Sequence, residues 1–188
     1  MIALFFSNRI KRSKIGIQNG KDENIMNGGL PMIKMAIMYD FDKTLSPKNM
    51  QEFSFLKSIG YDDPNEFWKQ CSEVAHMQKM DSNLAYMYQM LQKSNACDKP
   101  IRREDFVKLG KDVELYPGVE NWFERIKKYG AERGIEVEHY IISSGLAEII
   151  EGTSIYPDFK KVYACKYYYN ASGVAAWPAM VVNYTTKT

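Results

Sequence analysis

The chain has 188 residues, of which 45% are apolar and 26% charged, a balance that excludes disorder of the whole chain. Of its 25 basic and 23 acidic side chains, six basic and two acidic ones lie in residues 1–34, which leaves 19 basic and 21 acidic ones in residues 35–188. A nucleic-acid-binding protein would concentrate basic side chains on its folded body, so no nucleic-acid partner is expected. No Cys-x-x-Cys pair, signal peptide or apolar run of about 20 residues is found, which predicts a cytoplasmic protein without a membrane anchor.

The first half of the chain divides into three predicted parts. Residues 1–34 are predicted to be a flexible leader, since residues 7–31 mix Ser, Asn, Lys and Gly without apolar periodicity. The apolar run Met35–Tyr39 has the length of a strand. From residue 50 to 115 the pattern becomes helical, with a capped start at Asp63-Pro-Asn-Glu66, apolar residues at i, i+3, i+4 and i+7 from Leu84 to Leu91, and a third helix over 103–113.

The second half alternates between helices and strands. The expected elements are a helix over 119–130, a strand over 137–142, a helix over 146–150, a strand over 162–168 and a short returning strand over 174–177 that ends at Pro178. This order predicts an α/β fold, with a Rossmann-like parallel sheet of about three core strands and an inserted all-helical cap. The expected domains are the leader 1–34, a core of 35–49 and 116–188, and the cap 50–115.

Polar residues directly follow two of the apolar strands, Asp40-Phe-Asp42 after the first and Ser143-Ser-Gly145 after the next. Ligands of an open parallel sheet bind beyond the carboxyl ends of its strands, so the two clusters are expected to meet in one crevice. Two neighbouring carboxylates repel each other unless a cation lies between them or one is protonated, which indicates a Mg²⁺ ligand and an acid/base pair. An Asp-x-Asp triplet alone is more often a solvated turn, so the ordered set of strand, triplet, helical insertion and second cluster carries the prediction.

This ordered set resembles the haloacid dehalogenase (HAD) superfamily, and within it the phosphoserine-phosphatase-like branch, whose helical cap follows the first motif. The family's first motif, Asp-x-Asp-x-Thr-Leu, matches Asp40–Leu45, and its second, a Ser or Thr that ends the next core strand, matches Ser143. The resemblance covers about residues 33–188. It implies a hydrolase that needs Mg²⁺ and cleaves small phosphorylated substrates, phosphomonoesters, through an aspartyl-phosphate intermediate.

The resemblance also implies roles for individual residues. Asp40 would be the nucleophile and a metal ligand, and Asp42 the general acid/base whose main-chain carbonyl also binds the metal. Asp42 favours phosphatase chemistry, because dehalogenases of the family lack this second acid. The loops would hold the phosphoryl oxygens or be ordered around them through Thr44, Ser143, Ser144 and Gly145. The catalytic lysine of the third motif is best matched by Lys187, with Lys160, Lys161 and Lys166 as rivals.

The family's fourth motif, Gly-Asp-x-x-x-Asp, has no match, since residues 159–188 contain no Asp or Glu. We therefore expect a C-terminally truncated chain that binds Mg²⁺ poorly, is nearly inactive and exposes the edge of strand 35–39 to self-association. The alternative is a catalytically silent fragment or binding module. A receiver-type phospho-accepting domain fits less well, because it has no helical insertion after its first acidic cluster. His76 and His139 are predicted to be structural, and the substrate and the oligomeric state stay open.

Overall fold

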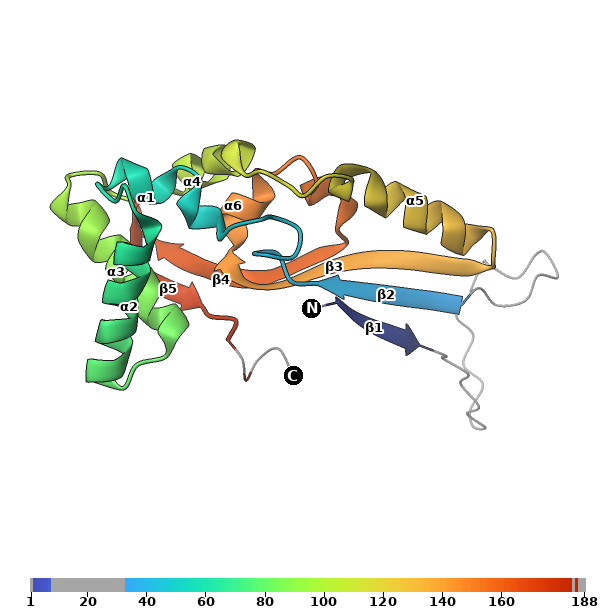
Figure 1. Cartoon of the computed structure of the whole chain (residues 1–188), viewed down its shortest axis with the longest axis horizontal. Helices are drawn as coiled ribbons and strands as arrows, with labels where there is room; N and C mark the ends of the chain where they lie inside the picture. Colours follow the sequence, from blue (N-terminus) through green and yellow to red (C-terminus); the bar gives the residue numbers. More distant parts are fainter. Residues whose placement is uncertain (1, 8–32, 184, 186–188) are drawn as a thin grey trace.

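The computed structural model describes residues 2–7, 33–183 and 185 of the chain, and within them a five-stranded sheet carries the helices (Figure 1). Its strands follow one another in sequence order: β1 (Ile2–Ser7), β2 (Ile33–Tyr39), β3 (Ile135–Leu146), β4 (Lys161–Tyr169) and β5 (Ala175–Met180). Strands β2, β3 and β4 are parallel, whereas β1 and β5 pair antiparallel at the two edges. The predicted α/β fold with about three parallel core strands is confirmed.

A helical insertion follows β2, as predicted. Its elements are η1 (Met50–Glu52), α1 (Phe55–Ser58), α2 (Pro64–Gln78), α3 (Ser82–Ala96), α4 (Arg103–Leu109) and η2 (Gly110–Asp112), and the chain returns to the sheet through α5 (Val119–Ala131), α6 (Ala147–Glu151) and η3 (Tyr156–Asp158). The insertion stands at the end of the sheet toward which β2 and β3 run, and α5 lies along one face (Figure 1). In the described ranges, no helix combines the length and the apolar character needed to cross a bilayer.

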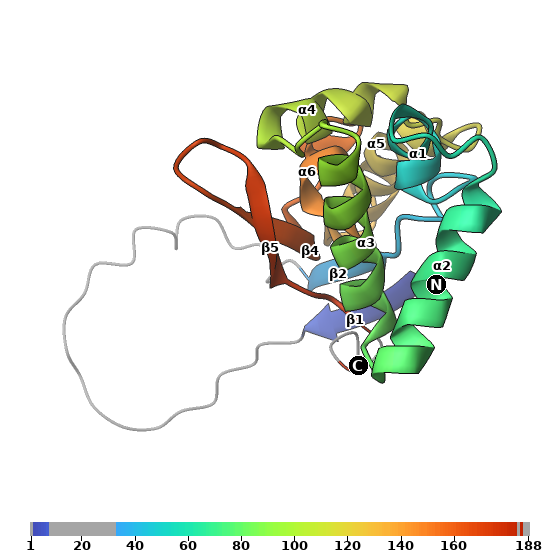
Figure 2. The ribbon, with the colours of Figure 1, turned by 90° about the vertical axis from the view of Figure 1, so that its left-hand side faces the viewer.

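Helices α2 and α3 of the insertion begin where the sequence indicates. Asp63 caps α2 by accepting a hydrogen bond from the Asn65 N–H at 2.9 Å, and Asp81 caps α3 through the N–H groups of Asn83 and Leu84 at 2.9 and 3.1 Å. Each cap satisfies donors that the first helical turn leaves unpaired. Helices α2 and α3 pack side by side (Figure 2).

The face of the sheet that α5 covers holds a buried hydrogen-bond chain. Trp122 Nε1–H donates to the Tyr39 hydroxyl at 2.9 Å, Tyr39 lies 3.0 Å from His139 Nδ1, and His139 Nε2 lies 3.3 Å from the Phe123 carbonyl. Every group in this series of hydrogen bonds has a partner when the Tyr39 hydroxyl donates to Nδ1 and the imidazole carries its proton on Nε2. Burial lowers the pKa of His139, which favours this neutral form, and raises the pKa of Tyr39 to about 12. His139 is therefore structural, as predicted.

The first residues of the expected leader are a strand. In β1, Leu4 pairs with Ile37 in an antiparallel register that covers the outer edge of β2. The expectation that this edge of β2 is exposed is therefore wrong. Residue 1 and residues 8–32 of the expected leader lie outside the described residues.

Two other strands extend further than predicted. Strand β3 continues past Ile142 through the Ser-Ser-Gly sequence to Leu146, so this cluster belongs to the strand itself. Strand β5 continues through Pro178, which pairs with Tyr167, to Met180. Proline fits there because β5 is an edge strand of the described sheet. The backbone N–H that proline lacks is not needed on the outer side of such a strand, where no described strand pairs with it.

At the end of the insertion, the backbone of α4 and η2 closely approaches the backbone of α6, which belongs to the core. A Cβ atom on Gly152 would lie 1.7 Å from the Val107 carbonyl oxygen, and one on Gly110 would lie 2.3 Å from the Ile149 carbonyl oxygen. Only glycine fits at either position. The end of the insertion therefore rests directly on the segment that follows β3.

Candidate active site

The loop after β2 turns two carboxylates to the same side. Tyr39 and Phe41 are 1% and 0% exposed, so their side chains lie in the core. Because side chains alternate along an extended chain, Asp40 and Asp42 lie on the opposite side. The loop then closes tightly, with the N–H of Leu45 donating to the Phe41 carbonyl at 2.9 Å.

Asp42 is held between the start of the insertion and the end of β3. Its Oδ1 accepts a hydrogen bond from the Met50 N–H at 2.9 Å, and its Oδ2 lies 2.8 Å from the point where a Cβ atom on Gly145 would stand. Met50 also reaches β3, because its Sδ lies 3.1 Å from the Leu146 nitrogen and accepts that N–H. The first cluster, the insertion and the second cluster thus meet at the Asp42 carboxylate.

The pleat of β3 separates the two serines of the second cluster. Tyr39 pairs with Ile141, so Ser143 continues the buried side of β3 and Ser144 the other side. Ser143 is fully buried, and its Oγ accepts the Gly145 N–H at 3.0 Å. The Ser144 carbonyl accepts a hydrogen bond from the Tyr86 hydroxyl at 2.7 Å.

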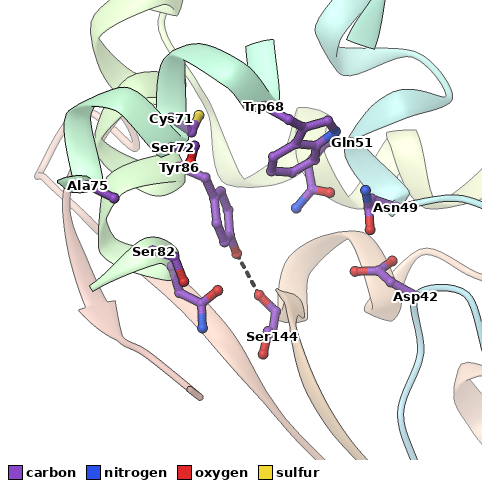
Figure 3. Close-up of a pocket in the computed structure, with 11 residues that line it drawn as sticks. Asp42, Asn49, Gln51, Trp68, Cys71, Ser72, Ala75, Ser82, Tyr86 and Ser144 are labelled. Carbon is purple, nitrogen blue, oxygen red and sulfur yellow. Dashed lines mark hydrogen bonds between the residues drawn. The ribbon is translucent and has the colours of Figure 1, made fainter. Parts of the chain in front are cut away.

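A pocket of about 330 Å³, called the main pocket because Asp42 lines it, opens between the insertion and the sheet (Figure 3). It is lined by Asp42, Asn49, Gln51, Trp68, Cys71, Ser72, Ala75, Ser82, Asn83, Tyr86 and Ser144. Among these described lining residues, Asp42 is the one whose side chain is a carboxyl group, and none is a Lys or Arg. Of the residues predicted from the sequence, Asp42 and Ser144 line this pocket, whereas Asp40, Ser143 and Gly145 do not. Thr44 lines a second pocket with Tyr39 and Trp122.

The sequence patterns did not single out four residues that shape the main pocket. Trp68 and Asn49 both donate to Glu52 Oε1, from Trp68 Nε1 at 2.7 Å and from the Asn49 amide. Tyr86 lies off the apolar stripe that predicts α3, and its pKa is raised by burial and by neighbouring groups that include Asp42. Gln51 is 1% exposed. Only the folded arrangement brings these residues to one wall, so no local pattern could have found them.

The lysine of the expected third motif is not located. Lys187 lies outside the described residues. Among its rivals, Lys160 pairs with Glu138, and the Lys161 ammonium lies 4.9 Å from the centre of the Tyr163 ring. Neither of these two, nor Lys166, lines the main pocket.

The carboxylates offer a small donor set for a metal ion. Within residues 2–7, 33–183 and 185, no three His, Cys, Asp or Glu side chains gather closely enough to hold one. Mg²⁺ needs few protein ligands, since it keeps several waters and takes oxygens from a phosphorylated substrate. The Asp40 carboxylate and the main-chain carbonyl of Asp42, at the end of β2, fit such an ion.

Comparisons with known proteins show a HAD-like fold. No family model matches the sequence. An uncharacterized protein of Borreliella burgdorferi is 24% identical over 143 residues, which are 71% of this chain and 50% of that protein. The crystal structure of a HAD family hydrolase from Salmonella enterica serovar Typhi superposes with a TM-score of 0.56 at 16% identity, over 80% of this chain and 47% of that one. A phosphoserine phosphohydrolase-like protein from Francisella tularensis gives a TM-score of 0.49 at 20% identity, over 75% and 62% of the two chains. The chain thus spans about half the length of the first two proteins.

Proposed function

We propose that this chain, whose fold is HAD-like, carries the catalytic carboxylates of a Mg²⁺-dependent phosphatase that hydrolyses small phosphomonoesters. One observation supports the proposal above all: Asp42 is fixed by the Met50 N–H at 2.9 Å and faces a pocket at the carboxyl ends of two parallel strands. A rigidly held carboxyl group at the wall of a pocket can exchange a proton with a bound leaving group. The likeness to a HAD family hydrolase of Salmonella enterica supports the same chemistry.

In the proposed reaction, the Asp40 carboxylate attacks phosphorus, and the bond from phosphorus to the ester oxygen breaks. Its electron pair stays on the leaving oxygen, to which the Asp42 carboxyl group gives its proton. Asp42 then takes a proton from a water molecule whose oxygen attacks the aspartyl-phosphate. The bond from phosphorus to Asp40 breaks, inorganic phosphate leaves, and both carboxyl groups return to their starting states.

The remaining groups would hold the phosphoryl oxygens in place. The Asp40 carboxylate and the main-chain carbonyl of Asp42 would hold Mg²⁺, whose positive charge would offset the negative charge on those oxygens. Main-chain N–H groups around Ser144 and Gly145 are the candidate donors, although the Gly145 N–H bonds to Ser143 Oγ and would have to exchange partners. Thr44 orders the loop, and Lys187 remains the proposed cation of the third motif.

The proposal is tested with p-nitrophenyl phosphate in Mg²⁺, comparing the 188-residue chain with its Asp40→Asn and Asp42→Asn variants. Asp40→Asn should abolish hydrolysis, because an amide nitrogen is not a nucleophile toward phosphorus. In Asp42→Asn, p-nitrophenolate needs no proton to leave, so one equivalent should be released in a burst. Steady turnover should then be about 10²–10⁴-fold lower, since the water that cleaves the aspartyl-phosphate has lost its base.

The control is Asp62→Asn, which removes an exposed carboxylate that does not line the pocket. This variant should hydrolyse the ester at the rate of the unchanged chain. Hydroxylamine added to the stalled Asp42→Asn protein should convert the acyl phosphate into a hydroxamate on Asp40, which mass spectrometry detects. Full activity of Asp40→Asn would contradict the proposal.

A second candidate is a phosphate-binding module without turnover. The small metal-donor set among the described residues favours it, because a weakly held Mg²⁺ gives little catalysis. Such a module would bind inorganic phosphate in calorimetry yet release no p-nitrophenolate, whereas the proposed phosphatase would do both.

A further inference from the structure

Gln51 presents an unsatisfied polar atom at the wall of the main pocket. The residue lies on η1, directly after the Met50 that holds Asp42, and its side chain is 1% exposed. Its Oε1 is buried and has no hydrogen-bond partner in the structure. Figure 3 shows its amide below the Trp68 ring, pointing toward the space bounded by Tyr86, Ser144 and Asp42. A buried carbonyl oxygen without a hydrogen-bond partner costs free energy. A ligand that donates a hydrogen bond to this oxygen removes that cost and binds more tightly as a result.

The charges around the pocket favour one class of ligand. Among the described residues, no Lys or Arg lines the pocket, and Asp42 brings a carboxyl group to it. The Glu52 carboxylate lies behind the wall, where it holds Trp68 and Asn49. The other polar lining groups are amides, hydroxyls and a thiol. A ligand carboxylate would therefore meet no cationic partner among the described lining residues and would face acidic groups, which disfavours it.

Aromatic faces add to this preference. The Trp68 and Tyr86 rings lie 5.9 Å apart at an interplanar angle of 71°, and both line the pocket. Aromatic faces attract ammonium groups, and the effect grows when the cation leaves water. Acceptor oxygens, ring faces and the Asp42 carboxyl group thus surround the same space.

We propose that this pocket binds the alcohol part of the phosphate ester and selects amino alcohols that carry no carboxylate, with Gln51 Oε1 accepting a hydrogen bond from the ammonium group. The proposal rests on the proposed function, which sets the phosphoryl group at Asp40 and the leaving oxygen at Asp42. The alcohol then extends from Asp42 into the space below Trp68, where Gln51 is the specificity-determining residue.

Binding calorimetry tests the selectivity without depending on turnover. The Asp40→Asn protein, which should not consume the esters, is titrated with phosphoethanolamine, with O-phosphoserine and with n-propyl phosphate. O-phosphoserine differs from phosphoethanolamine by an added carboxylate, and n-propyl phosphate replaces the ammonium group with a methyl group. We expect phosphoethanolamine to bind at least about tenfold more tightly than either of the other two, the size of one charge-assisted hydrogen bond.

Two substitutions of Gln51 assign the preference to this residue. In the same background, Gln51→Leu should weaken the binding of phosphoethanolamine about tenfold and leave that of n-propyl phosphate unchanged. Gln51→Lys, which introduces a cation, should reverse the order so that O-phosphoserine binds more tightly than phosphoethanolamine. Gln92→Leu, on the exposed side of α3, is the matched control and should bind all three esters as the parent does.

The outcomes separate this inference from the proposed function. Equal or tighter binding of O-phosphoserine by the parent protein would overturn the selectivity, and so would the absence of binding by all three esters. A loss of affinity in Gln51→Leu that is the same for phosphoethanolamine and n-propyl phosphate would show a merely structural role. If the preference holds while the unchanged chain fails to hydrolyse p-nitrophenyl phosphate, the proposed function fails and the binding preference stands.

Discussion

Gly145 is the residue at which the three parts of the candidate site touch. A Cβ atom there would lie 2.2 Å from Met50 Cε and 2.8 Å from Asp42 Oδ2. The methionine end can swing aside, but the carboxylate is fixed by its bond to the Met50 N–H. Gly145→Ala should therefore displace Asp42 and lower the turnover of p-nitrophenyl phosphate about 10²-fold, as misplaced catalytic groups do.

The matched control for Gly145→Ala is Gly60→Ala. Gly60 has a φ of +92° and nothing within 4 Å of its added Cβ, so alanine there strains the backbone without approaching the site. This control should lower the melting temperature and keep the rate per folded molecule. Equal rates for Gly145→Ala and the unchanged chain would show that Asp42 does not need its present position.

At the scale of elements, the pairing of β1 with β2 covers the edge of β2 that does not face β3. Neighbouring residues of a strand direct their N–H groups to opposite sides, and Leu4 and Phe5 stand opposite Ile37 and Ala36. Proline removes one N–H, so only one of the variants Leu4→Pro and Phe5→Pro should break a ladder bond. That variant should show faster amide hydrogen exchange in the β2 peptide and more self-association by light scattering, because an uncovered strand edge pairs with other chains.

The other proline variant serves as the internal control and should resemble the unchanged chain in both measurements. If neither proline alters the exchange of β2, the strand pairing at this edge is not what protects it. If both alter it equally, the loss comes from the disruption of β1 as a whole and not from a single hydrogen bond.

The same element shows where sequence reasoning was incomplete. The apolar run at residues 2–6 has the strand length that correctly predicted β2, yet the polar residues after it led to the prediction of a leader. Helices α2 and α3 were predictable, because Asp63 and Asp81 are local capping signals. Within the candidate site, the Asp40-Phe-Asp42 motif could be read from the chain. Gln51 could not, because its importance depends on a pocket wall that forms only when η1, α2 and α3 come together.

At the scale of the whole molecule, one buried cluster of the described residues joins the sheet to the insertion, so a charge buried beside it affects the stability of the entire fold. Glu148 on α6 is 4% exposed, its Oε2 has no hydrogen-bond partner, and burial raises its pKa above the ordinary value of 4.5. A carboxyl group with a raised folded pKa stabilises the fold fully below its unfolded pKa. That contribution is lost as the pH rises through the folded pKa.

Glu148→Gln removes this titration and keeps an oxygen that can accept the Tyr167 N–H. The variant should unfold at a higher urea concentration than the unchanged chain at pH 8, and the difference should shrink toward pH 4.5. Glu124→Gln, at an exposed position of α5, should show no such pH-dependent difference. A difference that stays constant from pH 4.5 to pH 8 would mean that folding does not shift the pKa of Glu148.

The walls of the main pocket are anchored to different degrees. Helix α4 is locked onto α6 by glycine contacts, and α3 is tied to the sheet through the hydroxyls of Tyr86 and Tyr167. Helix α2, which carries Trp68 and Cys71, rests mainly on α3. Burial raises the pKa of the Cys71 thiol to about 12, so Cys71 resists alkylation while α2 is seated. In a chain whose exposed Cys97 has been replaced by serine, the rate of thiol labelling at Cys71 should therefore measure how often α2 moves away from the pocket. An ester bound in the pocket should lower this labelling rate.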